Sequence, residues 1–458
     1  MASRLPKYII RAAEADGLPP EEYLGIAIDG RHIAFGQIRG GVFTPGRLLP
    51  LSPTTFGMVA NGCLGGRRRA VTAENLVADF GHKSTFGGDF MQALADALAR
   101  ALISSGDAKA KKIQMLFKEW SALYGQVADL GLVQQGSIRE SLGFVWNGDQ
   151  TRWLAASLFV AHTFHSLLVK LLVGEIVAAH GLASSSSIVD DILAEPESAR
   201  FSRLKADIEE GGFFNAVGLK GFVEEAIFSW YLDAATSNSA SNRELAGGLA
   251  GILAQLHLYR LDTLQRVGRS RDVLRDFYED IVPGELRKSL GEFYTPDWLA
   301  EYTVDQLKFT KKDWLTKRVL DPTGGSGTFL LEAIRRKRAA MTAENYSPDY
   351  MLDLLMSSVW GFDLNPLAVQ TARANVLMAV ADLLKACGGK EIEIPVLLAD
   401  AIYSPAATPD GNSDEVVYTI GSDVANLEVV LPVALAFDRL SLDRVFEVMS
   451  REVRAVQR

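Results

Sequence analysis

The stretch that decides the fold is RVLDPTGGSGTFLLEAI, residues 318–334. It reads as a buried strand, a glycine-rich turn and the first turns of a helix. Glycines in such a turn let the backbone approach a ligand closely, at the positive end of the helix dipole. The pattern therefore predicts a ligand site at residues 321–327, with a purely structural turn as the alternative.

Two familiar nucleotide-binding turns do not match this stretch. A Walker loop ends in Gly-Lys-Ser/Thr, whereas Gly327 is followed by Thr328 and Phe329. A dinucleotide fingerprint has a third glycine three residues after the second, and that position is Leu330. The missing lysine disfavours a phosphate loop, and the missing glycine disfavours a dehydrogenase-like protein.

Strand and helix patterns alternate through the last third of the chain. Strand-like runs at 318–320, 358–362 and 394–398 alternate with helical runs at 329–338 and 366–385. Such alternation is the signature of βαβ units and a parallel sheet. An α/β fold is therefore predicted here.

Each of the three predicted strands ends close to a carboxylate: Asp321, Asp363 and Asp400. Clustered carboxylates are costly to bury unless cations or hydrogen-bond donors accompany them. Asp363, at the tip of the second strand, is placed to accept from both ribose hydroxyls. Asp400 can accept from an adenine amino group, with Leu364 and Ala401 beside the base. S-adenosylmethionine (SAM) offers an ammonium group, a ribose and an aminopurine, and so fits this description.

An N-cap role is the alternative reading of Asp363, because a helix is predicted to begin at Pro366. Asn365 stands directly before that proline and fills the capping role better. The ribose reading of Asp363 is therefore preferred.

Four ordered motifs carry a resemblance to a known family: GEFYTP (291–296), DPTGGSGTFL (321–330), GFDLNP (361–366) and LLAD (397–400). They resemble motifs X, I, II and III of the N6-adenine DNA methyltransferases. The resemblance is closest to the subgroup in which motif X comes first, as in type I modification subunits and in type IIG or phage-defence methylases. It implies a Rossmann-like SAM-dependent methyltransferase core that acts on DNA.

The resemblance also implies which residues hold the cofactor. The FYTP segment and the glycine turn would hold the methionine end of SAM, and the next two strand ends would hold the ribose and the adenine. These roles are carried over to Phe293, Tyr294, Thr295, Pro296, Asp321, Thr323, Gly325, Gly327, Asp363, Leu364, Asp400 and Ala401.

The catalytic Asn/Asp-Pro-Pro-aromatic loop of this family does not occur in the sequence. The single Pro-Pro pair follows Leu18, and Asn365-Pro366 is followed by Leu367. No catalytic residue is therefore assigned, and the methyltransferase portion is expected to be incomplete at its C-terminal side. Either a second subunit or downstream polypeptide supplies the loop and target recognition, or the chain is a non-catalytic SAM- and DNA-binding subunit.

The chain is predicted to be multi-domain α/β, with a small α/β region at 1–105, a helical linker domain at 106–285 and the SAM-binding portion at 286–458. The first region has a hairpin signal at Asp29-Gly30 and resembles the end of a restriction-nuclease-like domain. It has no Glu-x-Lys ahead of the hairpin, so no nuclease centre is predicted. Helices are expected at 90–104, 112–120, 153–174, 223–232, 244–267 and 297–307.

Residues 153–174 could be mistaken for a membrane span. His162, His165 and Lys170 interrupt this apolar run, which favours a buried helix of a non-membrane protein. The histidines lack an acidic or cysteine partner nearby, so no metal site is assigned.

Composition and charge indicate the cellular compartment and the part of the chain that would contact DNA. The two cysteines, Cys63 and Cys387, suit a reducing compartment, and the first residues show no secretory signal, so a cytoplasmic location is expected. The formal net charge of −9 lies mostly in residues 291–458. If DNA binds, residues 1–290 are the expected surface.

Overall fold

The structure is a computed structural model that describes residues 4–39, 41–65, 69–123, 136, 138–139, 142–223, 227–260, 272–289, 292, 294–388, 390–401, 406–407, 414–421, 426–436, 438, 441 and 444. The chain divides into two compact units, Met1–Leu398 and Ala399–Arg458. The predicted domain boundaries near residues 105 and 285 both fall within the first unit, and they stay predictions.

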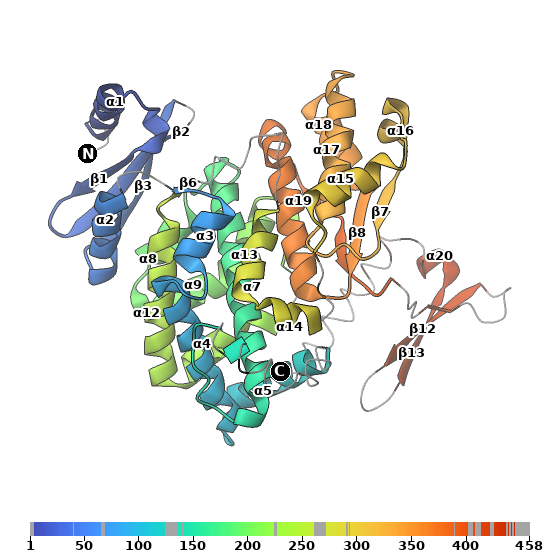
Figure 1. Cartoon of the computed structure of the whole chain (residues 1–458), viewed down its shortest axis with the longest axis horizontal. Helices are drawn as coiled ribbons and strands as arrows, with labels where there is room; N and C mark the ends of the chain where they lie inside the picture. Colours follow the sequence, from blue (N-terminus) through green and yellow to red (C-terminus); the bar gives the residue numbers. More distant parts are fainter. Residues whose placement is uncertain are drawn as a thin grey trace. The chain divides into compact units, whose positions relative to one another are not determined.

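The glycine turn belongs to a parallel sheet of three strands. These are β7 (Val319–Asp321), β8 (Val359–Asp363) and β10 (Val396–Leu398), hydrogen-bonded in the order β10-β8-β7 (Figure 1). Helices α17 (Thr328–Thr342) and α19 (Pro366–Ala386) alternate with the strands and pack on the sheet. The predicted alternation of strand and helix is confirmed.

The two faces of this sheet are covered differently. A Cβ atom on Gly361 would lie 2.6 Å from Leu330 Cδ1, so α17 packs almost directly on β8. Leu320 and Trp360 are register partners on the opposite face, and Leu320 is 53% exposed. Helices therefore cover one face, while the other leaves an apolar side chain half exposed.

A helical body surrounds α7 (Trp153–Ala179), which is buried along almost its whole length. The helices packed on it include α4 (Thr85–Ile103), α5 (Ala108–Leu123), α8 (Ile188–Ala194) and α13 (Val273–Ile281). A helix that is apolar all round is expected to be buried. The predicted buried helix over 153–174 is confirmed, and α4 packs with this body.

Among the residues that the structure describes, two helices are long and apolar enough to cross a membrane, Gln150–Ala179 and Pro366–Ala386. In the structure 100% and 83% of their most apolar windows are buried. Core helices pass the same test of length and hydropathy, and this burial is what a core helix shows.

An ion pair is buried inside the helical body. Lys170 of α7 donates to a carboxylate oxygen of Glu209, and the two side chains are 3% and 2% exposed. The Tyr231 hydroxyl donates to the other oxygen of Glu209 at 2.8 Å. The pair is fully enclosed, so each charge depends on its partner for compensation.

The N-terminal region forms an antiparallel meander of β1 (Leu24–Ile28), β2 (His32–Arg39) and β3 (Val42–Pro50). Gly30 in the first turn has φ 88°, a left-handed conformation that favours glycine. Asp29 Oδ1 accepts from two backbone amides across the turn at 2.7 and 2.8 Å. The predicted Asp29-Gly30 hairpin is confirmed.

The helix predicted over 244–267 is wrong at its C-terminal end. Helix α12 spans Ser239–Leu256, and the chain then forms β6 (Tyr259–Arg260), which pairs in parallel with β4 (Arg69–Ala70). The buried His257 Nδ1 lies 2.7 Å from Asp190 Oδ1, and such tertiary contacts override helix propensity here. Residues 261–267 lie outside the described residues.

The helix predicted over 223–232 begins later than expected. A 3₁₀ turn, η5 (Ile227–Ser229), precedes α11 (Trp230–Ser237), and residues 224–226 lie outside the described residues. Trp230 is completely buried, and its indole N–H donates to Thr163 Oγ1 at 2.7 Å. That contact anchors the first turn of α11.

The remaining elements of the first unit are α1 (Leu5–Asp16), η1 (Pro20–Glu22), α2 (Pro53–Gly65), α3 (Ala73–Phe80), η3 (Gln150–Arg152), α9 (Glu197–Leu204), the π-helical η4 (Lys205–Glu209), α10 (Gly212–Ala216), β5 (Leu219–Lys220), α14 (Gly284–Ser289), α15 (Asp297–Asp305), α16 (Lys311–Thr316), α18 (Pro348–Ser358) and β9 (Ile392–Glu393). The second unit contains an antiparallel sheet of β11 (Ala406–Ala407), β12 (Glu415–Gly421) and β13 (Asn426–Pro432), followed by α20 (Val433–Ala436).

Removing one charge of the buried ion pair should destabilise the helical body. Glu209→Gln leaves the Lys170 ammonium without its counter-charge, and we expect a loss of about 3 kcal/mol of unfolding free energy. Thermal unfolding followed by circular dichroism measures the shift. Glu210→Gln is the matched control, because Glu210 and its partner Lys205 are more than half exposed. Equal unfolding midpoints for the two variants would contradict this account.

Candidate cofactor-binding site

The glycine turn connects β7 to α17 and is held against the next strand. The Gly324 amide donates to the Phe362 carbonyl at 2.7 Å, and the Gly327 amide donates to the Gly324 carbonyl at 2.8 Å. Gly325 and Gly327 have φ values of 53° and 90°, in the left-handed region. These contacts fix a tight turn directly before the open N-terminus of α17.

Close packing adds a second reason for glycine at position 327. A Cβ atom there would lie 3.2 Å from the Ala372 side chain on α19. Gly325 differs, because no atom lies within 4 Å of the place where its Cβ would be. The turn is therefore closed toward α19 and open at Gly325.

Asp363, at the end of β8, joins two loops. Its Oδ2 accepts from the Gly325 amide at 2.8 Å, and its Oδ1 accepts from the Asn365 amide at 2.8 Å. The Asn365 side chain accepts from the Leu367 amide at 2.9 Å and caps α19. The expectation that Asn365 provides the cap is confirmed, and Asp363 is left to hold the glycine turn.

Asp321, at the end of β7, has one oxygen without a hydrogen-bond partner. Its Oδ1 accepts from the Thr323 amide at 3.2 Å, whereas its Oδ2 is buried and unpaired within the described part of the chain. Burial raises the pKa of Asp321, and the nearby Asp363 carboxylate raises it further. The site therefore favours a ligand that brings a positive charge or donors to these two carboxylates.

A buried amide ties the glycine turn to the helical body. Asn375 of α19 donates to the Ser326 carbonyl and to Asp272 Oδ1, both at 2.8 Å. Asp272 is fully buried and caps α13 by accepting from the Arg275 amide at 2.9 Å. Three elements distant in sequence thus meet at one side chain, which limits the movement of the turn.

The described residues of the FYTP segment contact α13. Arg275 donates to the Thr295 carbonyl at 3.0 Å and pairs with Asp297 at 3.1 Å. The Tyr294 ring packs edge-on against Tyr278 at 5.8 Å between centroids, and the exposed Pro296 occupies the N-cap position of α15. Phe293 lies outside the described residues, so its predicted role is not tested.

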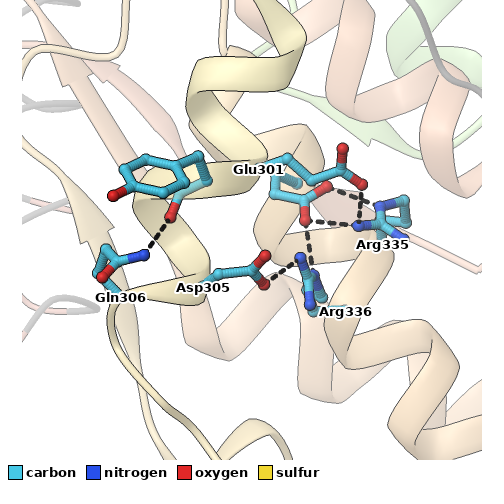
Figure 2. A network of polar contacts seen from close by, with 7 residues as sticks. Glu301, Asp305, Gln306, Arg335 and Arg336 are labelled. Atoms are coloured by element: carbon cyan, nitrogen blue, oxygen red, sulfur yellow. Dashed lines mark hydrogen bonds and ion pairs between the residues drawn. The ribbon is translucent and has the colours of Figure 1, made fainter.

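Helix α15, which continues the FYTP segment, is attached to α17 by an ion-pair network (Figure 2). Glu301 pairs with Arg335 at 3.1 Å, and Asp305 pairs with Arg336 at 2.6 Å. Glu332 accepts from both arginines at 2.6 Å. A network that shares one carboxylate holds two helices better than isolated surface pairs do. The helices that begin at the FYTP segment and at the glycine turn are therefore fixed to one another.

Glu292, in the same GEFYTP motif, was not among the predicted site residues. Its Oε2 accepts from the Tyr278 hydroxyl at 2.8 Å, and its Oε1 accepts from Asn365 Nδ2 at 3.1 Å. Burial raises the pKa of Glu292 to about 7, and the charge of Asp363 acts in the same direction. The one sequence signal was its position inside the motif, because its partners lie far along the chain.

The predicted adenine-contacting residues divide between the two units. Leu364 follows β8 and is 60% exposed at the edge of the turn. Asp400 and Ala401 belong to the second unit and are exposed there. The structure therefore brings together the residues around Asp321 and Asp363, and the adenine role of Asp400 and Ala401 stays a prediction.

The histidine pair of α7 has separate hydrogen-bond partners. His162 Nε2 lies 3.0 Å from the Tyr278 hydroxyl, and His165 Nε2 lies 3.3 Å from Thr371 Oγ1. Burial lowers the pKa of both histidines to about 3, so both are neutral. Within the described residues, no group of three or more histidine, cysteine, aspartate or glutamate side chains could hold a metal ion.

The arrangement fits a cationic ligand that carries hydroxyl donors. The unpaired Asp321 Oδ2 can receive an ammonium group, and Asp363 retains acceptor capacity beyond its two amide bonds. The open space over Gly325 and the N-terminus of α17 lets the ligand reach the backbone. SAM has the groups that such a site would bind.

A family comparison covers this part of the chain. Residues 269–417 match the family described as N-6 DNA Methylase. The resemblance to the N6-adenine DNA methyltransferases that the four motifs carry is confirmed by this match. The family in general uses SAM.

Two curated relatives match the chain over short segments. The adenine-specific methyltransferase PglX of Streptomyces coelicolor is 31% identical over 112 residues, which cover 23% of this chain and 9% of the relative. The type II methyltransferase M.VspI of Vibrio sp. is 25% identical over 119 residues, which cover 25% of this chain and 24% of the relative. The chain thus matches less than a quarter of the length of each.

Solved structures show more distant likenesses. The Type ISP restriction-modification enzyme LlaBIII bound to DNA is 14% identical, with a TM-score of 0.34, over 68% of this chain and 17% of that chain. A type I restriction-modification methyltransferase subunit from Streptococcus thermophilus is 17% identical, with a TM-score of 0.24, over 71% of this chain and 62% of that chain.

Substitution of Gly327 should distort the turn. Gly327→Ala places a side chain at φ 90° and against Ala372, and we expect a loss of about 1–2 kcal/mol of stability. Gly247→Ala is the control, because this exposed glycine of α12 has open space around it and should gain up to about 1 kcal/mol. Thermal unfolding of both variants measures the difference. Shifts in the same direction would refute the requirement for glycine at position 327.

Proposed function

We propose that this chain is the cofactor-binding portion of a SAM-dependent adenine-N6 DNA methyltransferase of a restriction-modification or phage-defence system. The observation that carries the proposal is the pairing of Asp363 with the Gly325 amide at 2.8 Å, beside the unpaired Asp321 Oδ2. This pairing sets two carboxylates around one open turn, as a cofactor with an ammonium and a ribose requires. Membership of residues 269–417 in the methyltransferase family supports it.

Each part of the site has a proposed role. Asp321, Thr323 and Gly325 receive the methionine end of the cofactor, and Asp363 accepts from the ribose hydroxyls. Leu364 lies beside the adenine, with Asp400 and Ala401 as its further contacts. When bound, SAM supplies an activated methyl group on a sulfonium. The residues of this chain bind and orient the cofactor, and positioning is the main requirement for methyl transfer.

The proposed source of the acceptor chemistry is a second subunit or a downstream polypeptide. The motif that would hold the adenine amino group is not in the sequence. In the part of the chain that the structure describes, β7 pairs with β8 on one side alone, and Leu320 within β7 is 53% exposed. Parallel sheets are normally covered on both faces, which supports a partner segment at this edge. A non-catalytic SAM- and DNA-binding subunit is the second candidate.

The proposed partner is DNA, and the proposed location is the cytoplasm. DNA is expected to contact residues 1–290, where acidic and basic residues nearly balance.

Loss of the Asp363 carboxylate should abolish cofactor binding. Asp363→Ala removes the acceptor of both ribose hydroxyls and releases the glycine turn, so SAM affinity should fall at least about 100-fold. Isothermal titration calorimetry of the whole chain measures it. Asp353→Ala is the control, because Asp353 on α18 is half exposed and pairs with Lys390. Wild-type affinity in Asp363→Ala would exclude the proposed ribose contact.

A methylation assay distinguishes the two candidate functions. For the methyltransferase portion, the chain alone should bind SAM without transferring its methyl group to DNA. Addition of the polypeptide encoded next to it should produce N6-methyladenine, detected by mass spectrometry of digested DNA. Cofactor binding that never leads to methylation with such a polypeptide would favour the non-catalytic subunit.

A further inference from the structure

A chain of hydrogen bonds runs from the helical body to the cofactor loops. His162 Nε2 of α7 lies 3.0 Å from the Tyr278 hydroxyl, which donates to Glu292 Oε2 at 2.8 Å. Glu292 Oε1 accepts from Asn365 Nδ2 at 3.1 Å, and the Asn365 amide donates to Asp363 Oδ1 at 2.8 Å. Glu292 is thus two hydrogen bonds away from the proposed ribose acceptor.

The orientation of the Asn365 amide group is fixed from its other side. Its Oδ1 accepts from the Leu367 and Ala368 amides at 2.9 and 3.4 Å as the cap of α19. Its NH₂ group must therefore face Glu292, where it needs an acceptor. A side chain at position 292 that cannot accept leaves this loop without one of its supports.

We propose that Glu292 is a positioning residue of the cofactor site, which holds the Asp363 loop through Asn365 and supplies a negative charge that favours the cationic form of the cofactor. This inference rests on the proposed function and adds that the site distinguishes SAM from the product of methyl transfer. SAM carries a positive sulfonium, whereas S-adenosylhomocysteine, the product of methyl transfer, has a neutral thioether. A carboxylate near the bound ligand attracts the first and not the second.

The surroundings of Glu292 set its charge. The titratable and charged groups that face it are Tyr278 on α13, Arg287 on α14 and Asp363 at the end of β8. The pKa of Glu292 is raised to about 7, mainly by burial and also by the charge of Asp363, while Tyr278, Arg287 and Asn365 act in the opposite direction. The carboxyl group therefore gains or loses its proton near neutral pH.

The hydrogen-bond chain accommodates both protonation states. When Glu292 is ionised, the Tyr278 hydroxyl donates to it and accepts from the neutral His162. When Glu292 is protonated, it can donate to Tyr278, which then donates to His162 in its other tautomer. The hydrogen bonds of Glu292 persist in both protonation states, and only its charge changes. The pH therefore alters the preference for SAM over S-adenosylhomocysteine while the Asp363 loop stays in place.

The test compares two ligands across pH with the whole chain. Isothermal titration calorimetry gives the affinities for SAM and for S-adenosylhomocysteine between pH 6 and 8.5. In the wild type, SAM affinity should rise about fivefold with a midpoint near pH 7, relative to the affinity for the neutral ligand. The rise follows from the sign of the charge, because Glu292 is ionised above its pKa.

Two variants separate charge from geometry. Glu292→Gln keeps an acceptor for Asn365, mimics the protonated acid, and should match the wild type at pH 6 without the rise. Glu292→Ala removes the acceptor and should weaken both ligands about tenfold at every pH. Tyr278→Phe removes a bond that favours the ionised form, so it should move the midpoint to higher pH.

Glu344→Gln is the matched control, because Glu344 is a half-exposed partner of Lys311 and should keep the wild-type pH dependence. A wild-type rise in Glu292→Gln, or wild-type affinities in Glu292→Ala, would overturn the role of Glu292. A wild-type chain that binds no SAM at any pH would instead overturn the proposed function, and this inference with it.

Discussion

The hydrogen bond between the Gly325 amide and Asp363 Oδ2 is the contact on which the candidate site depends. It joins the turn after β7 to the loop after β8, so neither loop can shift without the other. The same carboxylate also accepts from Asn365, which starts α19. A single side chain therefore sets the spacing between two strand ends.

The helical body contributes to this site from outside the sheet. Asn375 bridges the Ser326 carbonyl and the buried Asp272, and Tyr278 supports Glu292. Both contacts reach α13, and α13 packs on α7. The region between the N-terminal meander and the sheet thus supports the glycine turn and the loop after β8, and a change in its packing would alter the position of Asp363.

Local sequence rules predicted those parts of the fold that short-range physics controls. The glycine turn, the strand ends at Asp321 and Asp363, and the Asn365 cap could be predicted because each depends on neighbours in sequence. The end of α12 at Leu256 could not, because the buried contact of His257 with Asp190 joins positions 67 residues apart. Glu292 escaped prediction for the same reason, since its partners are known only after α13 and the β8 loop have met.

The charged groups within α7 also matter before the protein has folded. This helix of 27 residues is apolar enough to be taken for a membrane span while it emerges from the ribosome. Lys170 near its middle would cost about 3 kcal/mol at the centre of a bilayer, and Glu175 adds to the cost. In the folded body the Lys170 ammonium pairs with Glu209, and the Glu175 carboxyl group, whose pKa burial raises to about 7, accepts from the Val189 amide. The polar groups that the core accommodates thus also raise the free-energy cost of placing this segment in lipid.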